Sequence, residues 1–390
     1  MKPLLLLFGL LLLIATEFLR IYYIMPFPGS QQENTVQLAY WIHRHRVLLR
    51  IIGFCLVAYP LWHYFKVSRT FARALLFLVV VLYAGIFFLF NYRFEADKMF
   101  LETKATIFKD AATNKVPEKR LALGLVINGQ ARAYPIEVIG YHHQVRDTVG
   151  GVPVLVTYCT VCRTGRVFSP VVDGRAETFR LVGMDHFNAM FEDNTTKSWW
   201  QQATGRCIAG PLKGRQLTEY PSTQSTLKTW IAEYPDAGIL QPNPVFTAKY
   251  AGLATYDDGS IPGHLEHRDS ASWHFKSWVI GVHTPTADKA YDWNNLAKNH
   301  LIQDTAVVVY LAPDTATFRA WNRDVNGQTL TFESAGNSQW TDINTHSTWD
   351  PLTGRSTEGP LKGAQLQSMQ AYQEFWHSWK NFHPATTVGQ

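Results

Sequence analysis

Two cysteines separated by two residues are the strongest candidates for chemistry in this sequence. Cys159 and Cys162 lie in the stretch Tyr-Cys-Thr-Val-Cys-Arg-Thr-Gly, between an apolar, β-branched run at 152–156 and the run Arg-Val-Phe at 166–168. A pair at the tip between two strands places two sulfurs within reach of one metal ion or of each other. Redox pairs of the thioredoxin type instead begin a helix, so the pattern favours a metal knuckle or a disulfide.

Three roles of this pair stay open from the sequence. Two thiolates would bind Zn²⁺, or copper if the softness of sulfur decides the choice. A disulfide closed over only two intervening residues is strained and easily reduced, which is typical of a redox site. The third alternative is a pair of inert, buried thiols.

Three further residues are candidate metal ligands, namely Cys207, His186 and His143. Cys207 would complete a site of three cysteines and one histidine, but a lone cysteine is more simply a thiol packed in a core. His186 follows Asp185, and a carboxylate is the usual partner that orients a ligating imidazole. The predicted metal set is therefore Cys159, Cys162, Cys207, His186 and His143, with the contribution of the last three open.

The elements that must position these residues occur twice. Residues 193–214 and 342–363 match at an offset of 149, and both end in Gly-Pro-Leu-Lys-Gly. Upstream the offset is 157, so that His143 corresponds to His300, although the second copy has no cysteines. A histidine kept where the sulfurs are missing indicates a structural hydrogen bond. We interpret the repetition as a duplicated domain.

The same repetition bears on the acidic residues Glu192 and Asp193, which precede Trp199 and Trp200. Paired acids near aromatic side chains occur in sugar-cleaving sites. Asp193, however, corresponds to Asp342 in the second copy. Its simpler role is that of a turn aspartate whose carboxylate accepts backbone hydrogen bonds.

Each copy is predicted to be mainly β with a few helices, an α+β arrangement. The first copy reads as a strand over 121–127, a short helix over 136–141, several strands, and a helix over 226–233 that ends before a proline; the second copy's last helix is expected over 369–381. The predicted domains are a first repeat with the cysteine pair at 95–240, an extended linker rich in Pro, Gly, Asp and His at 241–277, and a cysteine-free repeat at 278–390.

Three apolar segments precede the repeats, at 4–24, 47–65 and 74–90. Each is long enough to cross a hydrocarbon core of about 30 Å at roughly 1.5 Å per residue, so residues 1–94 are predicted to form a three-helix transmembrane region. A cleaved signal peptide is the alternative for the first segment, but no small-residue cleavage site follows it. Residues 34–46 are expected to lie on the membrane surface as an amphipathic helix.

The charges of the chain are concentrated beside these segments. Residues 1–94 hold nine Lys and Arg against two Glu, which gives +7, so the remaining 296 residues sum to −2 (+5 minus +7). Such a balance excludes a nucleic-acid-binding surface and favours membrane lipid as the partner of the basic residues. With Lys2 inside the cell, three spans place the soluble part outside. We therefore expect an inner (cytoplasmic) membrane protein whose soluble part faces the periplasm or exterior.

The motifs of the soluble part resemble the bacterial and archaeal DUF3179 family. The resemblance covers roughly residues 105–390 and is carried by the sequences at 128–135, 147–159, 198–212 and 375–384. It implies a fold unit and an extracytoplasmic setting, but no mechanism, because the family has no settled activity. Two features depart from the family pattern: Cys207 stands where a small apolar residue is usual, and the three-span region is an addition.

Two functional hypotheses follow. The first is a membrane-anchored, extracytoplasmic protein whose first repeat carries a thiolate site for zinc or copper, or a redox site, while the second repeat serves as scaffold. The alternative is a non-enzymatic ligand-binding or assembly module in which the cysteines are structural and the ligand lies between the copies under the linker. Whether the protein is an enzyme, and which small molecule or protein it meets, stay open.

Overall fold

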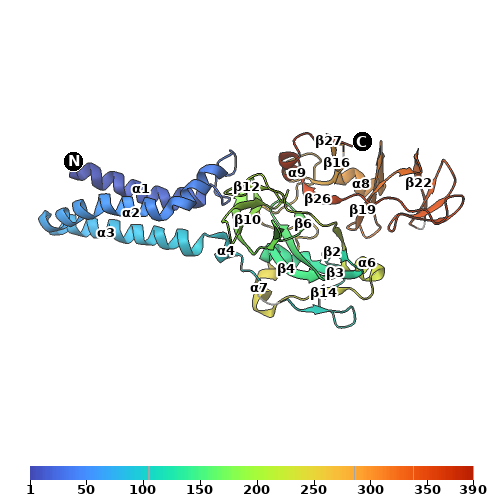
Figure 1. Ribbon diagram of the computed structural model, residues 1–390, viewed down its shortest axis with the longest axis horizontal. Coiled ribbons are helices and arrows are strands. Elements are labelled where there is room, and N and C mark those ends of the chain that lie inside the picture. Colours follow the sequence, from blue (N-terminus) through green and yellow to red (C-terminus); the bar gives the residue numbers. More distant parts are fainter. Residues whose placement is uncertain (104–105, 285, 337, 390) are drawn as a thin grey trace. The chain divides into compact units, whose positions relative to one another are not determined.

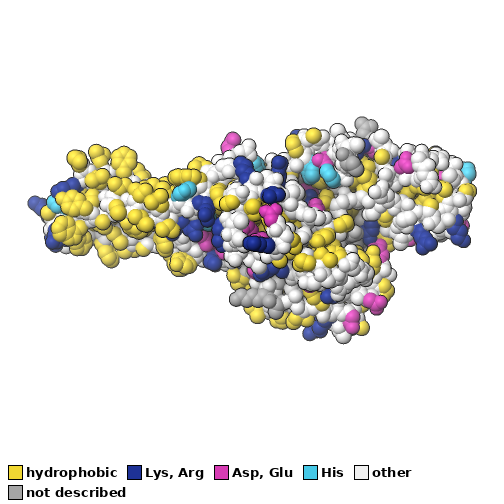
Figure 2. Space-filling view, in the orientation of Figure 1, with side chains coloured by type: hydrophobic (Ala, Val, Ile, Leu, Met, Phe, Trp, Pro, Cys, Tyr) yellow, Lys and Arg dark blue, Asp and Glu magenta, His cyan; other side chains and the backbone are white. Residues whose placement is uncertain are grey.

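The computed structural model describes residues 1–390 apart from 104–105, 285, 337 and 390. Three long helices come first, namely α1 (Lys2–Tyr22), α2 (Val36–Val67) and α3 (Thr70–Phe88), and one π-helical turn, Leu89–Arg93, continues the last. All three are long and apolar enough to cross a membrane. Hydrophobic side chains cover most of their visible face (Figure 2). The predicted apolar N-terminal helices are thus confirmed.

Helices α1 and α2 pack closely through small residues. A Cβ added to Gly9 would lie 2.6 Å from Val57, and one added to Gly53 would lie 2.6 Å from Leu13. Glycines at such positions let two helix backbones approach, which is the usual way in which helices associate in a lipid environment.

Residues 36–46 form the first turns of α2 and not a separate surface helix. Their apolar face is occupied by protein, because Val36 and Ala39 share a core with side chains of a β-sheet, and Tyr40 meets Trp199 edge to face at 5.1 Å. Residues 36–46 are thus helical as expected, but they continue into α2 and their buried face packs on the sheet.

This sheet has four antiparallel strands in the order β12-β11-β10-β9. The strands are β9 (Phe179–Asp185), β10 (Asn188–Asp193), β11 (Trp199–Gln201) and β12 (Cys207–Ala209). Together with the long helices and the short helix α4 (Ala96–Met99), they belong to one compact unit, residues 1–102 and 177–216. A second compact unit comprises residues 103–176 and 217–390.

The second unit contains two sheets with the same pattern of pairing. In the first, β13 (Thr223–Thr226), β2 (Leu121–Ile127) and β3 (Gln130–Pro135) pair antiparallel, and β3 pairs parallel with β14 (Gly238–Leu240), beside which lies β1 (Phe108–Lys109). In the other, β26 (Ala371–Phe375), β15 (Trp278–His283) and β16 (Asp288–Asp292) pair antiparallel, and β16 pairs parallel with β27 (Thr387–Val388).

A helix packs a tryptophan against the second strand of each sheet. Trp230 of α6 (Leu227–Glu233) lies on Gly124, and Trp379 of α9 (Trp376–Phe382) lies on Gly281. A Cβ on either glycine would come within 2.2 Å of the indole ring. Only glycine leaves room for the ring at both places.

The remaining strands form small antiparallel sheets and hairpins. After α5 (Ile136–His142) come β4 (Gln144–Val149), β5 (Val152–Cys159) and β6 (Thr164–Phe168), then β7 (Val171–Val172) and β8 (Arg175–Ala176). After α8 (Trp293–Asn299) come β17 (Leu301–Asp304), β18 (Val307–Leu311) and β19 (Phe318–Asn322), the hairpin β20 (Asp324–Val325) and β21 (Gln328–Thr329), and the sheet of β22 (Phe332–Gly336), β23 (Gln339–Asp342), β24 (Thr348–Asp350) and β25 (Arg355–Glu358).

The sheet-rich character of the soluble part is thus as predicted, with two local differences. The helix expected over 369–381 begins only at Trp376, because residues 371–375 pair along β15 and bury their side chains as strand β26. The linker 241–277 is not extended throughout. It contains a 3-10 turn over Pro244–Phe246 and the helix α7 (Thr247–Ala251).

Candidate functional site

The cysteine pair lies where the sequence predicts it, at the tip of the hairpin of β5 and β6. Cys159 is the last residue of β5, and Cys162 lies in the turn that leads to β6. The turn closes through Arg163, whose φ of 57° is left-handed. Neither cysteine is in a disulfide, and both lack exposed surface, at 0 % each.

Three segments of the second unit surround the two thiols. The Phe375 amide donates a hydrogen bond to the carbonyl of Cys162 (3.0 Å), and the Ser378 hydroxyl of α9 bonds to the Cys162 thiol. Lys276, just before β15, donates to the Val161 carbonyl (2.6 Å) and lies 3.2 Å from Nε2 of His377. The site therefore combines two sulfurs with an amine, an imidazole and a hydroxyl.

Burial controls protonation in this cluster. It raises the pKa of the Cys162 thiol well above its ordinary value, and the adjacent Cys159 raises it further. Burial also lowers the pKa of Lys276, which the neighbouring cysteines offset in part, and it lowers the pKa of His377 to about 3 with the help of the Lys276 charge. Burial thus favours the uncharged forms of Cys162, Lys276 and His377 as long as no metal ion replaces the thiol protons.

Two arginines of the hairpin fix the cysteine turn. Arg163 donates to Gln373 (2.9 Å) and to the Tyr256 carbonyl (3.0 Å), and its guanidinium lies 4.0 Å from the centre of the Trp278 ring. Arg166 forms a buried ion pair with Glu374 at 2.5 Å. Glu374 also accepts the Ser378 hydroxyl (3.0 Å), so the ion pair and the thiols share one network.

His143 ends α5 in the left-handed conformation, with φ at 61°, and its counterpart His300 ends α8 with φ at 59°. Nδ1 of His143 lies 3.2 Å from the Tyr141 carbonyl, and that of His300 lies 3.0 Å from the Leu311 carbonyl. Burial lowers the pKa of His143 to about 4. Both histidines thus bond to the backbone near a helix end.

The other two predicted ligands belong to the first unit, whereas Cys159, Cys162 and His143 belong to the second. Cys207 is buried on β12, its thiol donates to the Ala209 carbonyl at 3.5 Å, and burial raises its pKa to about 11. His186 lies in the turn between β9 and β10, and its Nδ1 lies 2.7 Å from the Asp185 carboxylate, which raises the pKa of the imidazole.

Of the two acidic residues before the tryptophan pair, Asp193 has the predicted turn function. The Asp193 carboxylate accepts the amides of the following turn, including Thr196 (2.5 Å), and the indole N–H of Trp200 (2.9 Å). Asp342 accepts Thr345 (2.5 Å) and Trp349 (2.9 Å) in the same way. Both carboxylates are therefore fully used by the fold.

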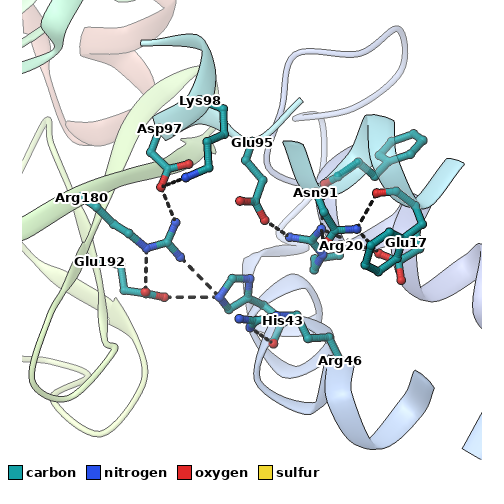
Figure 3. A network of polar contacts seen from close by, with 12 residues as sticks. Glu17, Arg20, His43, Arg46, Asn91, Glu95, Asp97, Lys98, Arg180 and Glu192 are labelled. Atoms are coloured by element: carbon teal, nitrogen blue, oxygen red, sulfur yellow. Dashed lines mark hydrogen bonds and ion pairs between the residues drawn. The ribbon is translucent and has the colours of Figure 1, made fainter. Parts of the chain in front are cut away.

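Glu192 instead belongs to a polar network that joins the sheet to the long helices (Figure 3). Its carboxylate pairs with Arg180 (2.9 Å), lies 3.5 Å from His43 of α2, and accepts the Trp199 indole N–H (2.9 Å). Although burial alone raises the pKa of Glu192, the contacts to His43, Arg180 and Trp199 hold it at about 2. Arg180 also reaches Asp97 at 3.4 Å.

The same network continues between the helices, where opposite charges are paired. Glu17 is fully buried and accepts Arg50 at 2.6 and 2.7 Å. Arg20 pairs with Glu95 at 2.6 Å and donates to the side chain of Asn91 (3.0 Å). Charges buried between apolar helices are costly unless they are compensated, and here Glu17, Arg20 and Arg50 each have a partner of opposite charge.

A cleft of about 430 Å³ lies in the second unit, with β2 and α6 on one side and β19 on the other. Gly124 and Trp230 line one side, and Phe318 and its neighbours on β19 line the other. On its wall Arg319 donates to both oxygens of Glu233 at 2.8 Å. None of the linker residues lines it, so its position differs from the one expected under 241–277.

Sequence analysis missed the side chains that complete the cysteine cluster. Lys276 and Ser378 are far from the cysteines in sequence. The only sign of either in the sequence is that a polar side chain occurs within an aromatic, tryptophan-rich stretch. It also missed a second cluster. Within the described ranges, the one group of three His, Cys, Asp or Glu side chains with ligand atoms within 4.8 Å of one another is His283, Asp288 and His383.

Comparison with known proteins gives a family but no activity. No curated protein and no solved structure matches the chain. The family model DUF3179, described as a protein of unknown function, matches residues 103–386. The chain therefore belongs to the DUF3179 family. Its three long helices precede the matched region and lie outside it.

Proposed function

We propose that this protein is a membrane-anchored, extracytoplasmic protein that binds a soft metal ion between the sulfurs of Cys159 and Cys162. The supporting observation is a pair of adjacent, fully buried cysteines that are not joined by a disulfide and lie beside the amine of Lys276. A small ion can enter such a site with little movement, whereas a protein disulfide cannot reach thiols without exposed surface. Buried thiols with raised pKa are also poor nucleophiles.

Copper(I) fits this donor set better than zinc. Structural zinc takes four ligands, and soft sulfur donors favour Cu(I). When the ion replaces the two thiol protons, the complex of one Cu(I) and two thiolates carries one negative charge. Protonated Lys276 balances that charge in the same pocket.

The second half of the chain would act as scaffold in this function. We infer that the two halves arose by duplication, because the two sheets share their pairing pattern and His143, Asp193 and Trp230 have counterparts in His300, Asp342 and Trp379. The second half lacks cysteines. It contributes Phe375, Ser378 and the Glu374 ion pair to the walls around the cysteines of the first.

An extracytoplasmic position is supported by the charges at the two ends of the helices. Lys2, Lys66, Arg69 and Arg73 belong to the N-terminus and the connection of α2 with α3, and the positive-inside rule assigns that end to the cytoplasm. The opposite end holds Arg20, Arg44, Arg46, Arg50 and Arg93, of which Arg20 and Arg50 are neutralised by acidic partners. A reporter enzyme that works only outside the cytoplasm should therefore be active when it is fused after Lys98. Activity of a reporter that works only in the cytoplasm, fused at the same place, would reverse the orientation.

Copper binding can be tested on the full-length protein in detergent. Under anaerobic conditions with a competing chelator, we expect one retained equivalent of Cu(I) and a fall of two in the number of titratable thiols. Cys159→Ser and Cys162→Ser should each abolish retention. Cys207→Ser, which removes a buried thiol of the other unit, is the matched control and should retain the ion.

Three results would contradict the proposal. Equal retention by the Cys159→Ser variant would place the copper elsewhere. Stoichiometric zinc in place of copper would overturn the choice of metal. Reversible oxidation of the two thiols by an added disulfide reagent, with two electrons and two protons passing to the reagent and no copper retained, would support a redox site instead.

The cleft favours a second candidate function, that of a non-enzymatic ligand-binding module. Its walls combine aromatic rings with a charged pair, Glu233 and Arg319, which suits a small ligand with apolar and polar parts. Filling the cleft by Ala320→Trp should abolish binding of any compound that raises the unfolding temperature of the protein, and should leave Cu(I) retention unchanged. A compound that stabilises both forms equally would exclude the cleft.

A further inference from the structure

A second cluster of metal-ligating side chains lies in the sheet of β15 and β16, apart from the cysteine pair. His283 is the last residue of β15 and Asp288 the first of β16, and the two are direct partners across the ladder. His383 follows α9, whose final turn accepts its amide. Three separate segments therefore bring one carboxylate and two imidazoles together.

Both imidazoles turn the same nitrogen toward the carboxylate. Nδ1 of His283 lies 2.6 Å from one oxygen of Asp288, and Nδ1 of His383 lies 2.9 Å from the other. A tetrahedral ion with bonds of about 2.0–2.2 Å holds its ligand atoms roughly 3.3 Å apart. The two nitrogen–oxygen separations would need to widen by about 0.4 and 0.7 Å to admit an ion.

The cluster is supported on one side and open on the other. His383 stacks on the buried ring of Trp379, with the ring centres 3.8 Å apart and the planes 18° from parallel. Its side chain is 15 % exposed, whereas that of His283 is 65 % exposed. An ion held here would thus have three fixed ligands and a face open to solvent for the remaining positions.

The corresponding positions of the first sheet show that the fold does not need this cluster. There, Val126 and Ala131 are partners across the ladder of β2 and β3, as His283 and Asp288 are across that of β15 and β16. Tyr234 follows α6 and packs on Trp230 at 4.4 Å, in the place of His383 on Trp379. The same backbone arrangement is therefore built without any ligating side chain, and all three ligands are particular to the second sheet.

From this geometry we propose that His283, Asp288 and His383 form a binding site for a divalent transition-metal ion of the zinc class. Two imidazoles and one carboxylate, without sulfur, suit Zn²⁺ and not the softer Cu(I). Each neutral imidazole frees Nδ1 for the ion by carrying its proton on Nε2. The site is independent of the cysteine pair and does not rest on the proposed copper function.

The test uses full-length protein in detergent, without a histidine tag, stripped with a chelator and carrying Cys159→Ser and Cys162→Ser. Calorimetric titration should show one equivalent of Zn²⁺ bound. Asp288→Asn and His383→Ala should each remove stoichiometric binding. His274→Ala is the matched control, since Nδ1 of His274 lies 2.9 Å from Asp269 as an exposed pair without a second imidazole, and it should leave binding unchanged.

Two further measurements keep the result interpretable. In the chain with Cys159 and Cys162 intact, Co²⁺ bound at this site in place of Zn²⁺ should give visible absorption without thiolate charge transfer. Grafting the ligands by Val126→His, Ala131→Asp and Tyr234→His should create a second equivalent if the first exists. Absence of Zn²⁺ binding in the stripped protein, or unchanged binding in a folded Asp288→Asn variant, would overturn the proposal.

Discussion

Replacement of Glu192 by glutamine should weaken the attachment of the sheet β9–β12 to the long helices. The carboxylate is 5 % exposed and its pKa is held at about 2, against an ordinary value of 4.5. A difference of about 2.5 units corresponds to roughly 3 kcal/mol of stability at neutral pH. Breaking a buried ion pair typically costs a similar amount, about 3–5 kcal/mol.

The sign of the pH dependence follows from the same shift. Because the pKa of Glu192 is lower in the folded protein, its contribution is complete above about pH 4.5 and is lost as the pH falls toward 2. The Glu192→Gln variant should therefore be less stable than the wild type at pH 7 and should lose less stability on acidification through this window.

The assay is thermal unfolding of the full-length protein in detergent, followed by tryptophan fluorescence. Trp199, one of the thirteen tryptophans, donates its indole N–H to Glu192, so part of the emission comes from the affected contact. Glu33→Gln is the control, since Glu33 is an exposed carboxylate of the same unit. The reasoning is refuted if Glu192→Gln and Glu33→Gln unfold at the same temperature at pH 7.

Three other perturbations test separate parts of the structure. Gly53→Leu should break the packing of α1 on α2 and lower the unfolding temperature in detergent, whereas Gly85→Leu, where a Cβ meets nothing within 4 Å, should not. Lys276→Met should weaken Cu(I) retention about tenfold or more in chelator competition, since the Lys276 charge lowers the pKa of the Cys162 thiol and each pKa unit corresponds to roughly 1.4 kcal/mol; unchanged retention would remove Lys276 from the site. Asp193→Ala and Asp342→Ala should each cost about 2 kcal/mol or more of unfolding free energy, because each leaves a buried indole N–H without an acceptor, and a neutral result at either would contradict the turn role.

Local patterns in the sequence were sufficient to predict several elements correctly. The strand at 121–127, the helix that begins at Ile136 and the hairpin tip with the cysteine pair follow from short-range periodicity and turn residues. The turn role of Asp193 followed from its repetition as Asp342. In each case the deciding interactions lie within a few residues along the chain.

The missed features depend on contacts between distant segments. Nothing near Lys276 in the sequence indicates that it lies beside Cys162, and His383 joins Asp288 only because α9 packs on the neighbouring strand. Residues 371–375 read as helix by composition, yet pairing with β15 makes them a strand. Tertiary pairing outweighs local propensity at such places.

The sheet β9–β12 has a consequence for how the chain can be synthesised. Its side chains Val182 and Met190 share a core with Ile24 of the connection between the first two helices and with Val36 and Ala39 of the first turns of α2. During translation these N-terminal residues leave the ribosome long before the sheet does. The apolar surface that they form, the template of the sheet, is therefore already present when the strands emerge. A truncated chain that begins at residue 95, close to the matched family region, would lack the template. Its sheet would then present a bare apolar face and should aggregate, which makes the helices a folding partner of the soluble part as well as its anchor.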